Sequence, residues 1–240
     1  MLIGVSTVSV ILPSYNESES ICEAIDRITI ALGDRLSEII VVDDNSPDGT
    51  SDIVNAISNP KICLITRTNE RGLASAIKTG VELASGNFIV WLDCDLGIHP
   101  EEIPRLVEKL SHNDLAIGSR YLPTGEDQRP VWRSSLSYLL NWFAQQFLGS
   151  GITDYSSGFI AVRKEVLDLV EINPTGVFGE YFIEFVYKCK KNGLRIVEIP
   201  YSYYDRPRGI SKSSDTILTV VKLGWAYGLR IIALRFYSSY

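Results

Sequence analysis

The sequence predicts an α/β fold in which a mostly parallel sheet is flanked by helices. Three short apolar runs, at residues 8–12, 39–42 and 88–92, have the length and composition of buried strands. Segments with helical character lie between them, and this alternation is typical of a parallel sheet with right-handed crossovers. Each apolar run ends in a cluster of polar residues. Because ligands bind beyond the carboxyl ends of such strands, we expect the three clusters to share one pocket.

The first half of the chain alternates regularly between strand and helix. Helices are expected over residues 18–32, 50–57 and 73–83, the second of them after the turn-forming residues Pro47-Asp48-Gly49. The second half is less regular. Its expected elements are a helix over 104–110, a strand over 115–119, a helix with apolar residues at helical spacing over 136–147, a helix over 181–191, a strand over 195–199, a polar loop over 201–214 and a final helix.

No linker or internal repeat divides the chain, so we expect one domain over residues 1–214 and a helical appendage over 215–240. The composition, with 45% hydrophobic and 22% charged residues in 240, is that of a globular protein. The net charge of −6 argues against a nucleic-acid partner. Residues 206–240 nevertheless carry a net +5, which leaves −11 on the rest of the chain.

Cysteine usage and hydropathy indicate a cytosolic protein. Cys22, Cys63, Cys94 and Cys189 are far apart and form no CxxC pair, so neither a zinc site nor a disulfide framework is expected. The start of the chain has no secretory signal pattern. The most apolar segment, residues 217–237, contains three basic residues, which argues against a membrane-spanning helix.

The acidic sequence Asp93-Cys94-Asp95 follows the third predicted strand. Residues two apart on a strand point the same way, so both carboxylates can meet one cation. Hard oxygen ligands suit Mg²⁺ or Mn²⁺, which also take oxygens from a substrate diphosphate. The alternative is that the acids cap the helix that begins near Pro100.

Three other polar segments are open to two interpretations each. Residues 43–50 (DDNSPDGT) either form a strand-to-helix turn or use a carboxylate to hold a nucleoside. Residues 67–73 could face a phosphate, although the chain has neither a Walker sequence nor GxGxxG. Residues 205–212 (DRPRGISK) either bind phosphate or form a solvated loop. His99 and His112 have no Ser or Cys partner at the spacing of a hydrolase triad.

Taken in order, these segments resemble the inverting glycosyltransferases of family 2, which have the GT-A Rossmann-like fold, and most closely their dolichyl-phosphate mannose synthase branch. The motifs that carry the resemblance are ILPSYNE at 11–17, VDDNSPDGT at 42–50, DCDL at 93–96, GSRY at 118–121, the Arg, Ser and Asn at 133, 137 and 141, Asp154 with SGF at 157–159, and DR at 205–206 with SK at 211–212. Gly97 departs from the family pattern, which usually has Gln or Ser there as a further metal-side ligand; a water can take that place.

The resemblance implies a site for a nucleotide sugar and a lipid phosphate. Its nucleotide-sugar residues would be Pro13, Tyr15, Glu17, Asp43, Asp93, Cys94, Asp95, Arg120, Arg206 and Lys212. Its acceptor-phosphate residues would be Arg120, Arg133 and Ser137. Asp93 and Asp95 would hold Mg²⁺ or Mn²⁺, and catalysis would rest on these two with Arg120, Arg133, Arg206 and Lys212.

The activity that the resemblance implies is transfer of a hexose, above all mannose from GDP-mannose, to a polyprenyl or dolichyl phosphate. Two alternatives stay open from the sequence. One is a UDP-glucose-dependent enzyme that makes polyprenyl-phosphate glucose or glycosylates another acceptor. The other is an inactive nucleotide-binding partner in a membrane complex.

Two aromatic-rich helices predict contact with a membrane surface. Residues 136–148 and the tail from 215 onward are amphipathic, and the tail is basic. Such helices can lie in the bilayer interface, where Trp and Tyr are favoured and cations meet anionic headgroups. They can equally pack on each other or on a second subunit. The sequence thus predicts a peripheral protein on the cytoplasmic face of a membrane, and a homo-oligomer is possible.

Overall fold

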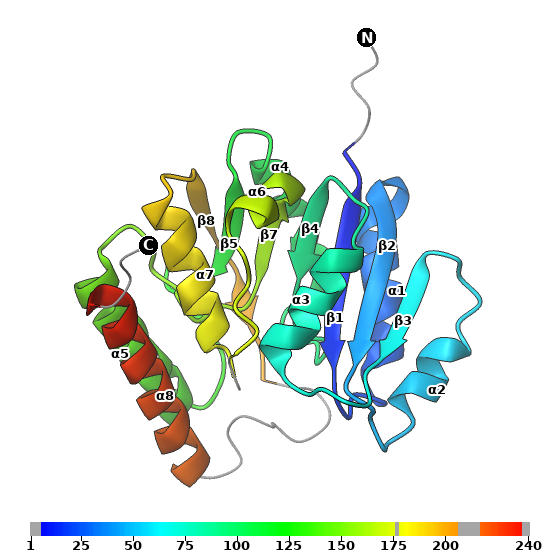
Figure 1. The fold of residues 1–240 in the computed structure, drawn as a ribbon, viewed down its shortest axis with the longest axis horizontal. Coiled ribbons are helices and arrows are strands. Elements are labelled where there is room, and N and C mark those ends of the chain that lie inside the picture. The colour runs from blue at the N-terminus through cyan, green and yellow to red at the C-terminus, as the bar shows by residue number, and fades with distance from the viewer. Residues whose placement is uncertain (1–5, 176–177, 206–216, 237–240) are drawn as a thin grey trace.

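The computed structural model describes residues 6–175, 178–205 and 217–236, and its centre is a seven-stranded sheet (Figure 1). The strand order is β3-β2-β1-β4-β7-β5-β8. The strands are β1 (Val8–Ser14), β2 (Leu36–Asp43), β3 (Ile62–Thr66), β4 (Phe88–Trp91), β5 (Leu115–Ser119), β7 (Ile160–Arg163) and β8 (Ile196–Pro200). A two-stranded sheet pairs β6 (Glu126–Asp127) with β9 (Ser202–Tyr203).

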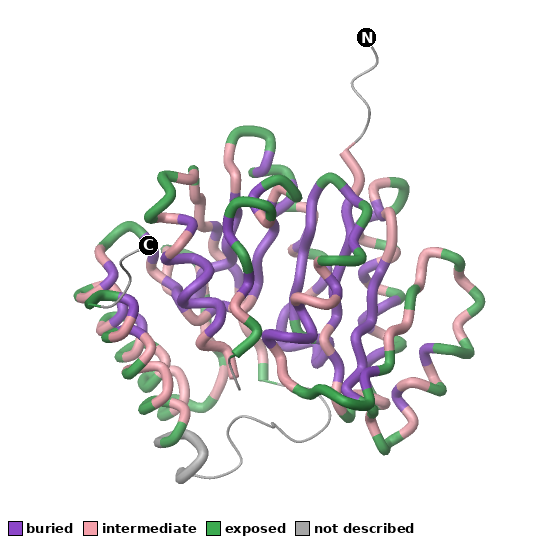
Figure 2. Tube along the Cα trace, viewed as in Figure 1, coloured by how far each residue is buried: buried purple, intermediate pink, exposed green. Residues whose placement is uncertain are grey.

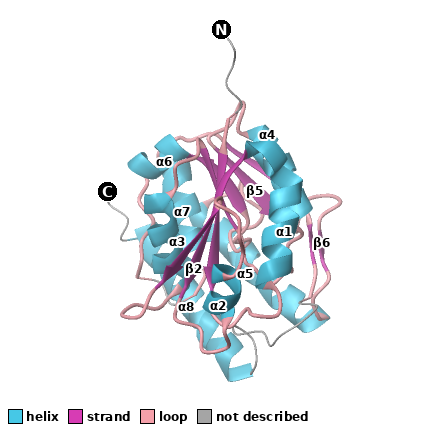
Figure 3. Cartoon of the chain, turned by 90° about the vertical axis from the view of Figure 1, so that its right-hand side faces the viewer, coloured by secondary structure: helices cyan, strands magenta, loops and turns pink. Residues whose placement is uncertain are grey.

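Helices cover both faces of the seven-stranded sheet (Figure 3). One face packs against α1 (Ile21–Leu32), α2 (Thr50–Asn55) and α4 (Ile103–Lys109). The other packs against α3 (Leu73–Leu83), α5 (Val131–Leu148), α6 (Lys164–Leu169), α7 (Glu180–Lys191) and α8 (Ile217–Phe236). Two short 3₁₀ turns, η1 (Gly33–Arg35) and η2 (Pro100–Glu102), precede β2 and α4. The sequence prediction of a mostly parallel sheet flanked by helices is confirmed.

The apolar runs become strands because they are buried on both faces (Figure 2). Val10, Ile40 and Val90, one from each of the three predicted strands, are at most 1% exposed. Strand pairing brings the carboxyl ends of β1 and β2 level, with Ser14 opposite Asp43. The polar residues that follow therefore meet at one edge of the sheet.

The structure contains several elements that the sequence analysis did not predict. β7 runs antiparallel to both β4 and β5, and it was not predicted, nor were β3 and α6. Ser202 and Tyr203 form β9 inside the segment expected to be a loop. The remainder of the 201–214 loop, from residue 206 onward, lies outside the described residues.

The C-terminal helix α8 lies alongside α5 and also contacts α7 (Figure 1). Ile231 and Leu234 are buried in this packing, whereas Trp225 and Phe236 are 71% and 67% exposed. One side of α8 is thus part of the protein interior, and the other side faces outward. Among the described helices, none is both long enough and apolar enough to cross a bilayer.

Candidate active site

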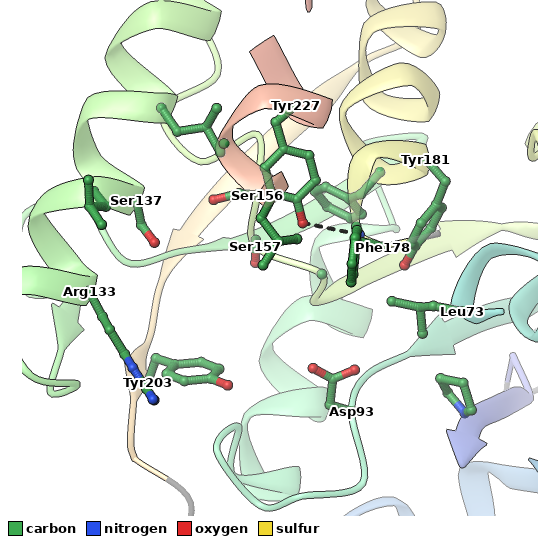
Figure 4. Close-up of a pocket in the computed structure, with 18 of the residues that line it drawn as sticks. Leu73, Asp93, Arg133, Ser137, Ser156, Ser157, Phe178, Tyr181, Tyr203 and Tyr227 are labelled. Atoms are coloured by element: carbon green, nitrogen blue, oxygen red, sulfur yellow. Dashed lines mark hydrogen bonds between the residues drawn. The ribbon is translucent and has the colours of Figure 1, made fainter. Parts of the chain in front are cut away.

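A cavity of about 890 Å³ opens at the carboxyl ends of β1, β2 and β4. Its polar wall comes from the loops that follow these strands. Its apolar wall comes from α5, from Tyr181 and Phe182 of α7, and from α8. Asp93, Arg133 and Tyr203 enter this space from three different elements (Figure 4). The sequence expectation that the strand-end clusters share one pocket is confirmed.

The acidic loop after β4 presents its two carboxylates differently. Asp93 is exposed to the cavity, whereas Asp95 is 2% exposed and accepts a hydrogen bond from the Gly97 N–H at 2.9 Å. Leu96, between Asp95 and Gly97, has a φ of 64°, a left-handed conformation that bulky residues rarely adopt. The strand ends at Trp91, so the two acids lie on a tight turn rather than on one face of a strand. The residue at the N-cap of η2 is His99, so neither Asp93 nor Asp95 occupies the N-cap position of that turn.

A divalent cation fits this loop only if the protein supplies some of its ligands and other molecules supply the rest. The described residues contain no group of three or more His, Cys, Asp or Glu placed to hold a metal. Asp93, with Asp95 behind it, offers the one or two carboxylates that Mg²⁺ takes when substrate phosphates and water complete its shell. The donor set therefore suits a metal that arrives with a diphosphate.

Asp43 builds the turn after β2 instead of facing the cavity. It is fully buried, and its carboxylate accepts hydrogen bonds from the Ser46 N–H at 2.9 Å and the Ser51 hydroxyl at 2.8 Å. Its neighbour Asp44 does line the cavity. Asp44 accepts from the Arg67 Nε–H at 2.7 Å, which ties the loop after β2 to the loop after β3. The expectation that Asp43 contacts a nucleoside directly therefore finds no support in this geometry.

The loops after β1 and β2 are joined by Asp48 and Thr50. Asp48 accepts hydrogen bonds from the Ser18 N–H at 3.0 Å and from the Thr50 N–H and hydroxyl at 3.1 and 2.6 Å. Burial alone would raise the pKa of Asp48, but these bonds outweigh it and lower the pKa to about 2. Thr50 Oγ1 in turn accepts the Glu17 N–H at 3.0 Å. The loop that carries Tyr15 and Glu17 is thus held in place.

Pro13, Tyr15, Glu17 and Cys94 all line the cavity, as the resemblance implies. The Arg71 guanidinium lies 4.4 Å from the centroid of the Tyr15 ring. This cation–π contact extends the flat surface that Tyr15 presents to the cavity. The sequence placed Arg71 only within a loop that could face a phosphate.

Arg120 reaches the cavity wall but is held by a buried acid. Its Nε and Nη2 each donate to Asp154 at 2.8 Å, and Nη2 also donates to the Ser156 hydroxyl at 2.9 Å. Arg120 is 5% exposed and Asp154 is fully buried. Burial would lower the pKa of Arg120, but the Asp154 carboxylate raises it well above the ordinary value.

Arg129 is a cavity residue that the sequence reasoning missed. Its Nε donates to Asp127 at 2.8 Å, its Nη2 donates to the Ser137 hydroxyl at 3.0 Å, and its guanidinium lies 5.0 Å from the Tyr203 ring centroid. It thereby orients Ser137, a predicted acceptor-phosphate residue, whose side chain comes from α5. No local pattern in the sequence distinguishes Arg129 from a surface arginine.

Arg133 lies on α5 beside the end of the described 178–205 segment. Its Nη1 is 3.9 Å from Asp205 Oδ1, and its guanidinium lies 5.2 Å from the Trp132 ring centroid. Arg133 and Ser137 both line the cavity, as predicted. Arg206 and Lys212, the other two predicted cationic residues, lie outside the described residues.

The helix α8 closes the apolar end of the cavity, although the sequence analysis separated residues 215–240 from the catalytic domain. Leu223, Gly224, Tyr227 and Gly228 line the cavity. The Tyr227 hydroxyl accepts the Gly179 N–H at 3.1 Å (Figure 4), and Arg230 forms an ion pair with the buried Glu184 of α7. In the described residues, α8 is therefore a wall of the site.

The chain matches the model of the glycosyl transferase family 2 over residues 9–170. It is 40% identical over 210 residues to a dolichol-phosphate mannosyltransferase from Pyrococcus furiosus, covering 85% of this chain but only 58% of that longer protein. It is 36% identical over 216 residues to a polyprenol monophosphomannose synthase from Mycolicibacterium smegmatis, covering 86% of this chain and 81% of the relative. A dolichol-phosphate mannosyltransferase from Saccharomyces cerevisiae is 32% identical over 223 residues, covering 88% of this chain and 82% of that protein.

Among solved structures, glucosyl-3-phosphoglycerate synthase from Mycobacterium tuberculosis, in a complex with Mn²⁺, UDP and glucosyl-3-phosphoglycerate, superimposes with a TM-score of 0.71. The match covers 96% of this chain and 80% of that one at 20% identity, which shows a shared fold. The sheet, the strand-end cavity and the family match agree, and the chain belongs to the glycosyl transferase family 2.

Proposed function

We propose that this enzyme transfers mannose from GDP-mannose to a polyprenyl phosphate, with inversion at the anomeric carbon. The observation that carries the proposal is the two-sided cavity. Carboxylates and arginines line the end near β1 and β4, and aromatic and aliphatic side chains of α5 and α8 line the other end. A polar nucleotide sugar and an acceptor with a phosphate head and an apolar chain match these two ends. The names of the relatives, a dolichol-phosphate mannosyltransferase and a polyprenol monophosphomannose synthase, support mannose as the sugar and a polyprenyl phosphate as the acceptor.

The donor end divides naturally between nucleoside and diphosphate. Pro13, Tyr15 and Glu17 form the wall that we assign to the nucleoside, and Asp44 takes the place expected for Asp43. Asp93 and Asp95 are assigned to the cation, Mg²⁺ or Mn²⁺. When bound, the cation would neutralise charge on the leaving diphosphate.

The transfer reaction depends more on stabilising the negative charges of its substrates than on a general base. An acceptor phosphate oxygen forms the bond to the anomeric carbon while the bond from that carbon to the β-phosphate oxygen breaks, and the electron pair leaves with GDP. The phosphate is already deprotonated near neutral pH, so no group must remove a proton. Arg133 and Ser137, the latter oriented by Arg129, face the place where the acceptor phosphate would lie. Arg120, which Asp154 holds in place, lines the cavity beside them.

The test is a transfer assay with purified full-length protein, labelled GDP-mannose, MgCl₂ and polyprenyl phosphate in detergent. We expect label to move into the organic phase, and we expect at least about 100-fold less transfer with Asp93→Asn. UDP-glucose is run in parallel as the alternative donor. Transfer from UDP-glucose alone would replace the proposed donor, and no transfer from any nucleotide sugar would support an inactive nucleotide-binding partner.

A further inference from the structure

Tyr203 belongs to the cavity wall and is bound to the acidic loop through the main chain. Tyr203 forms an isolated antiparallel bridge with Ile98. The N–H of Tyr204 donates to the Gly97 carbonyl at 2.9 Å. The segment that carries Tyr203 therefore keeps a fixed position relative to Asp93 and Asp95, although more than a hundred residues separate the two in sequence.

Gly97 provides the space in which the Tyr203 phenol lies. A Cβ atom added at Gly97 would lie 2.9 Å from Tyr203 Cζ, 3.0 Å from its hydroxyl oxygen and 3.1 Å from Asp95 Oδ1. The phenol oxygen and the carboxylate oxygen thus border the same small space. Because all three contacts are closer than ordinary van der Waals distance, a side chain at position 97 would displace the ring or the carboxylate.

The Tyr203 ring is held on its other sides by cations and by a second aromatic ring. The guanidinium carbons of Arg129 and Arg120 lie 5.0 and 5.8 Å from its centroid, and Tyr201 packs edge-on at 6.4 Å. The phenol hydroxyl borders the same space as Asp95 Oδ1 and can donate a hydrogen bond there.

We propose that Tyr203 is a positioning residue for the acidic loop, and that its hydroxyl, admitted by the absence of a side chain at Gly97, orients Asp93 and Asp95 to bind the divalent cation with the donor diphosphate. The inference rests on the proposed metal-dependent transfer. It assigns to Tyr203 and Gly97 the task of holding Asp93 and Asp95 in position, the two carboxylates that the described residues offer to the cation. Such outer partners commonly change metal affinity by about 10- to 100-fold.

The first test measures Mn²⁺ binding in the presence of GDP, by electron paramagnetic resonance of free Mn²⁺, on the full chain. Tyr203→Phe keeps the ring and removes the hydroxyl, so we expect the Kd for Mn²⁺ to rise about tenfold or more with an unchanged melting temperature. Tyr204→Phe is the matched control, because Tyr204 stacks on His99 at 4.2 Å and does not line the cavity. An unchanged Kd in Tyr203→Phe would overturn the inference.

The second test uses Gly97→Ala, alone and combined with Tyr203→Ala. We expect Gly97→Ala to weaken Mn²⁺ binding by displacing the phenol, and to add no further loss once the ring is gone. Fully additive losses would show that Gly97 acts independently of Tyr203 and would overturn the pairing. If wild-type protein binds Mn²⁺ with GDP but transfers no sugar, the proposed function is wrong and this inference is unaffected. If Tyr203→Phe leaves Mn²⁺ binding unchanged, this inference is wrong and the proposed function is unaffected.

Discussion

Arg120 and Asp154 form a bidentate ion pair in the protein interior, with both hydrogen bonds at 2.8 Å. The pair joins the end of β5 to the loop before β7, immediately behind the cavity. Sequence resemblance alone assigned Arg120 to the substrate phosphates. The geometry gives the guanidinium a structural task first, because two of its nitrogen atoms are committed to Asp154.

The first prediction follows from this pair. Asp154→Asn removes the charge that compensates a buried guanidinium, and breaking such a pair typically costs about 3–5 kcal/mol. We expect the free energy of unfolding, measured by urea denaturation, to fall by about 3 kcal/mol. The matched control is Arg195→Ala, which breaks a solvent-exposed ion pair with Asp114 and should leave the free energy of unfolding nearly unchanged. Equal losses in the two variants would contradict a special role for the buried pair.

The second prediction separates the two acids of the loop after β4. Asp93 is exposed to the cavity, so Asp93→Asn should reduce transfer at least about 100-fold and leave the melting temperature unchanged. Asp95 is buried and accepts the Gly97 N–H, so Asp95→Ala should lose transfer and also lower the melting temperature. Circular dichroism melting beside the transfer assay makes the comparison. Retained activity in either variant would contradict the proposed metal role of that residue.

The sequence anticipated the strands that are apolar throughout and bounded by polar turns. Residues 115–119 and 73–83 match β5 and α3 at both ends. β7 was missed because its four residues, Ile160–Arg163, are too few to show a period, and because no local signal sets strand direction. The antiparallel direction of β7 is set by how the chain returns to the sheet after α5, and this depends on tertiary structure.

The cavity lining was predictable where polar residues are concentrated in short motifs, as at Asp93 and Cys94. Asp95 does not line the cavity, and its metal role stays a prediction. The lining was not predictable where side chains act through distant partners. Arg129 orients Ser137 and packs on Tyr203, and none of these contacts lies within a recognisable spacing. β4 ends at Trp91, one residue before the end that hydrophobicity alone predicts, and the burial of Asp95 in the following turn had no signal in the sequence.

The third prediction concerns stability in acid. The pKa of Asp48 is about 2 in the folded protein against an ordinary value of 3.8. A lowered folded-state pKa means that the ionised carboxylate stabilises the fold above about pH 4 and that this contribution is lost as pH falls toward 2. Because Asp48 is exposed, solvent screening reduces the contribution to about 1 kcal/mol. The stability advantage of wild type over Asp48→Asn should narrow by most of that amount between pH 5 and pH 2.5, as measured by urea denaturation. A constant difference would contradict the assignment.

The fourth prediction concerns the outward side of α5 and α8. Tyr138, Trp142, Trp225 and Phe236 are each more than half exposed, and aromatic side chains of this kind favour the bilayer interface. We expect the protein to sediment with anionic liposomes at low salt, and Trp225→Gln with Phe236→Gln to reduce the bound fraction several-fold. Ile30→Gln is the control, since Ile30 is 81% exposed but lies on α1. Protein that stays in the supernatant at low salt would favour a protein-packing role for this surface.

The fifth prediction tests whether the apolar end of the cavity receives the acceptor chain. Gly228 of α8 lines the cavity, and a Cβ atom placed there would meet no atom within 4 Å. Gly228→Leu should therefore fill cavity space without a clash, and the loss of a helical glycine should favour α8 by about 1 kcal/mol. We expect the KM for polyprenyl phosphate to rise about tenfold while the Kd for GDP stays unchanged.

The control for Gly228→Leu is Leu229→Met, which changes an adjacent residue that is 51% exposed and does not line the cavity. Both variants are assayed with a short-chain acceptor in detergent, so that differences in membrane binding do not affect the measured KM. A phosphate head bound at Arg133 and Ser137 places the first isoprene units beside α5 and α8, where the added leucine would compete with them for apolar contacts. If Gly228→Leu alters the Kd for GDP and leaves the acceptor KM unchanged, the donor and acceptor ends of the cavity have been assigned the wrong way round.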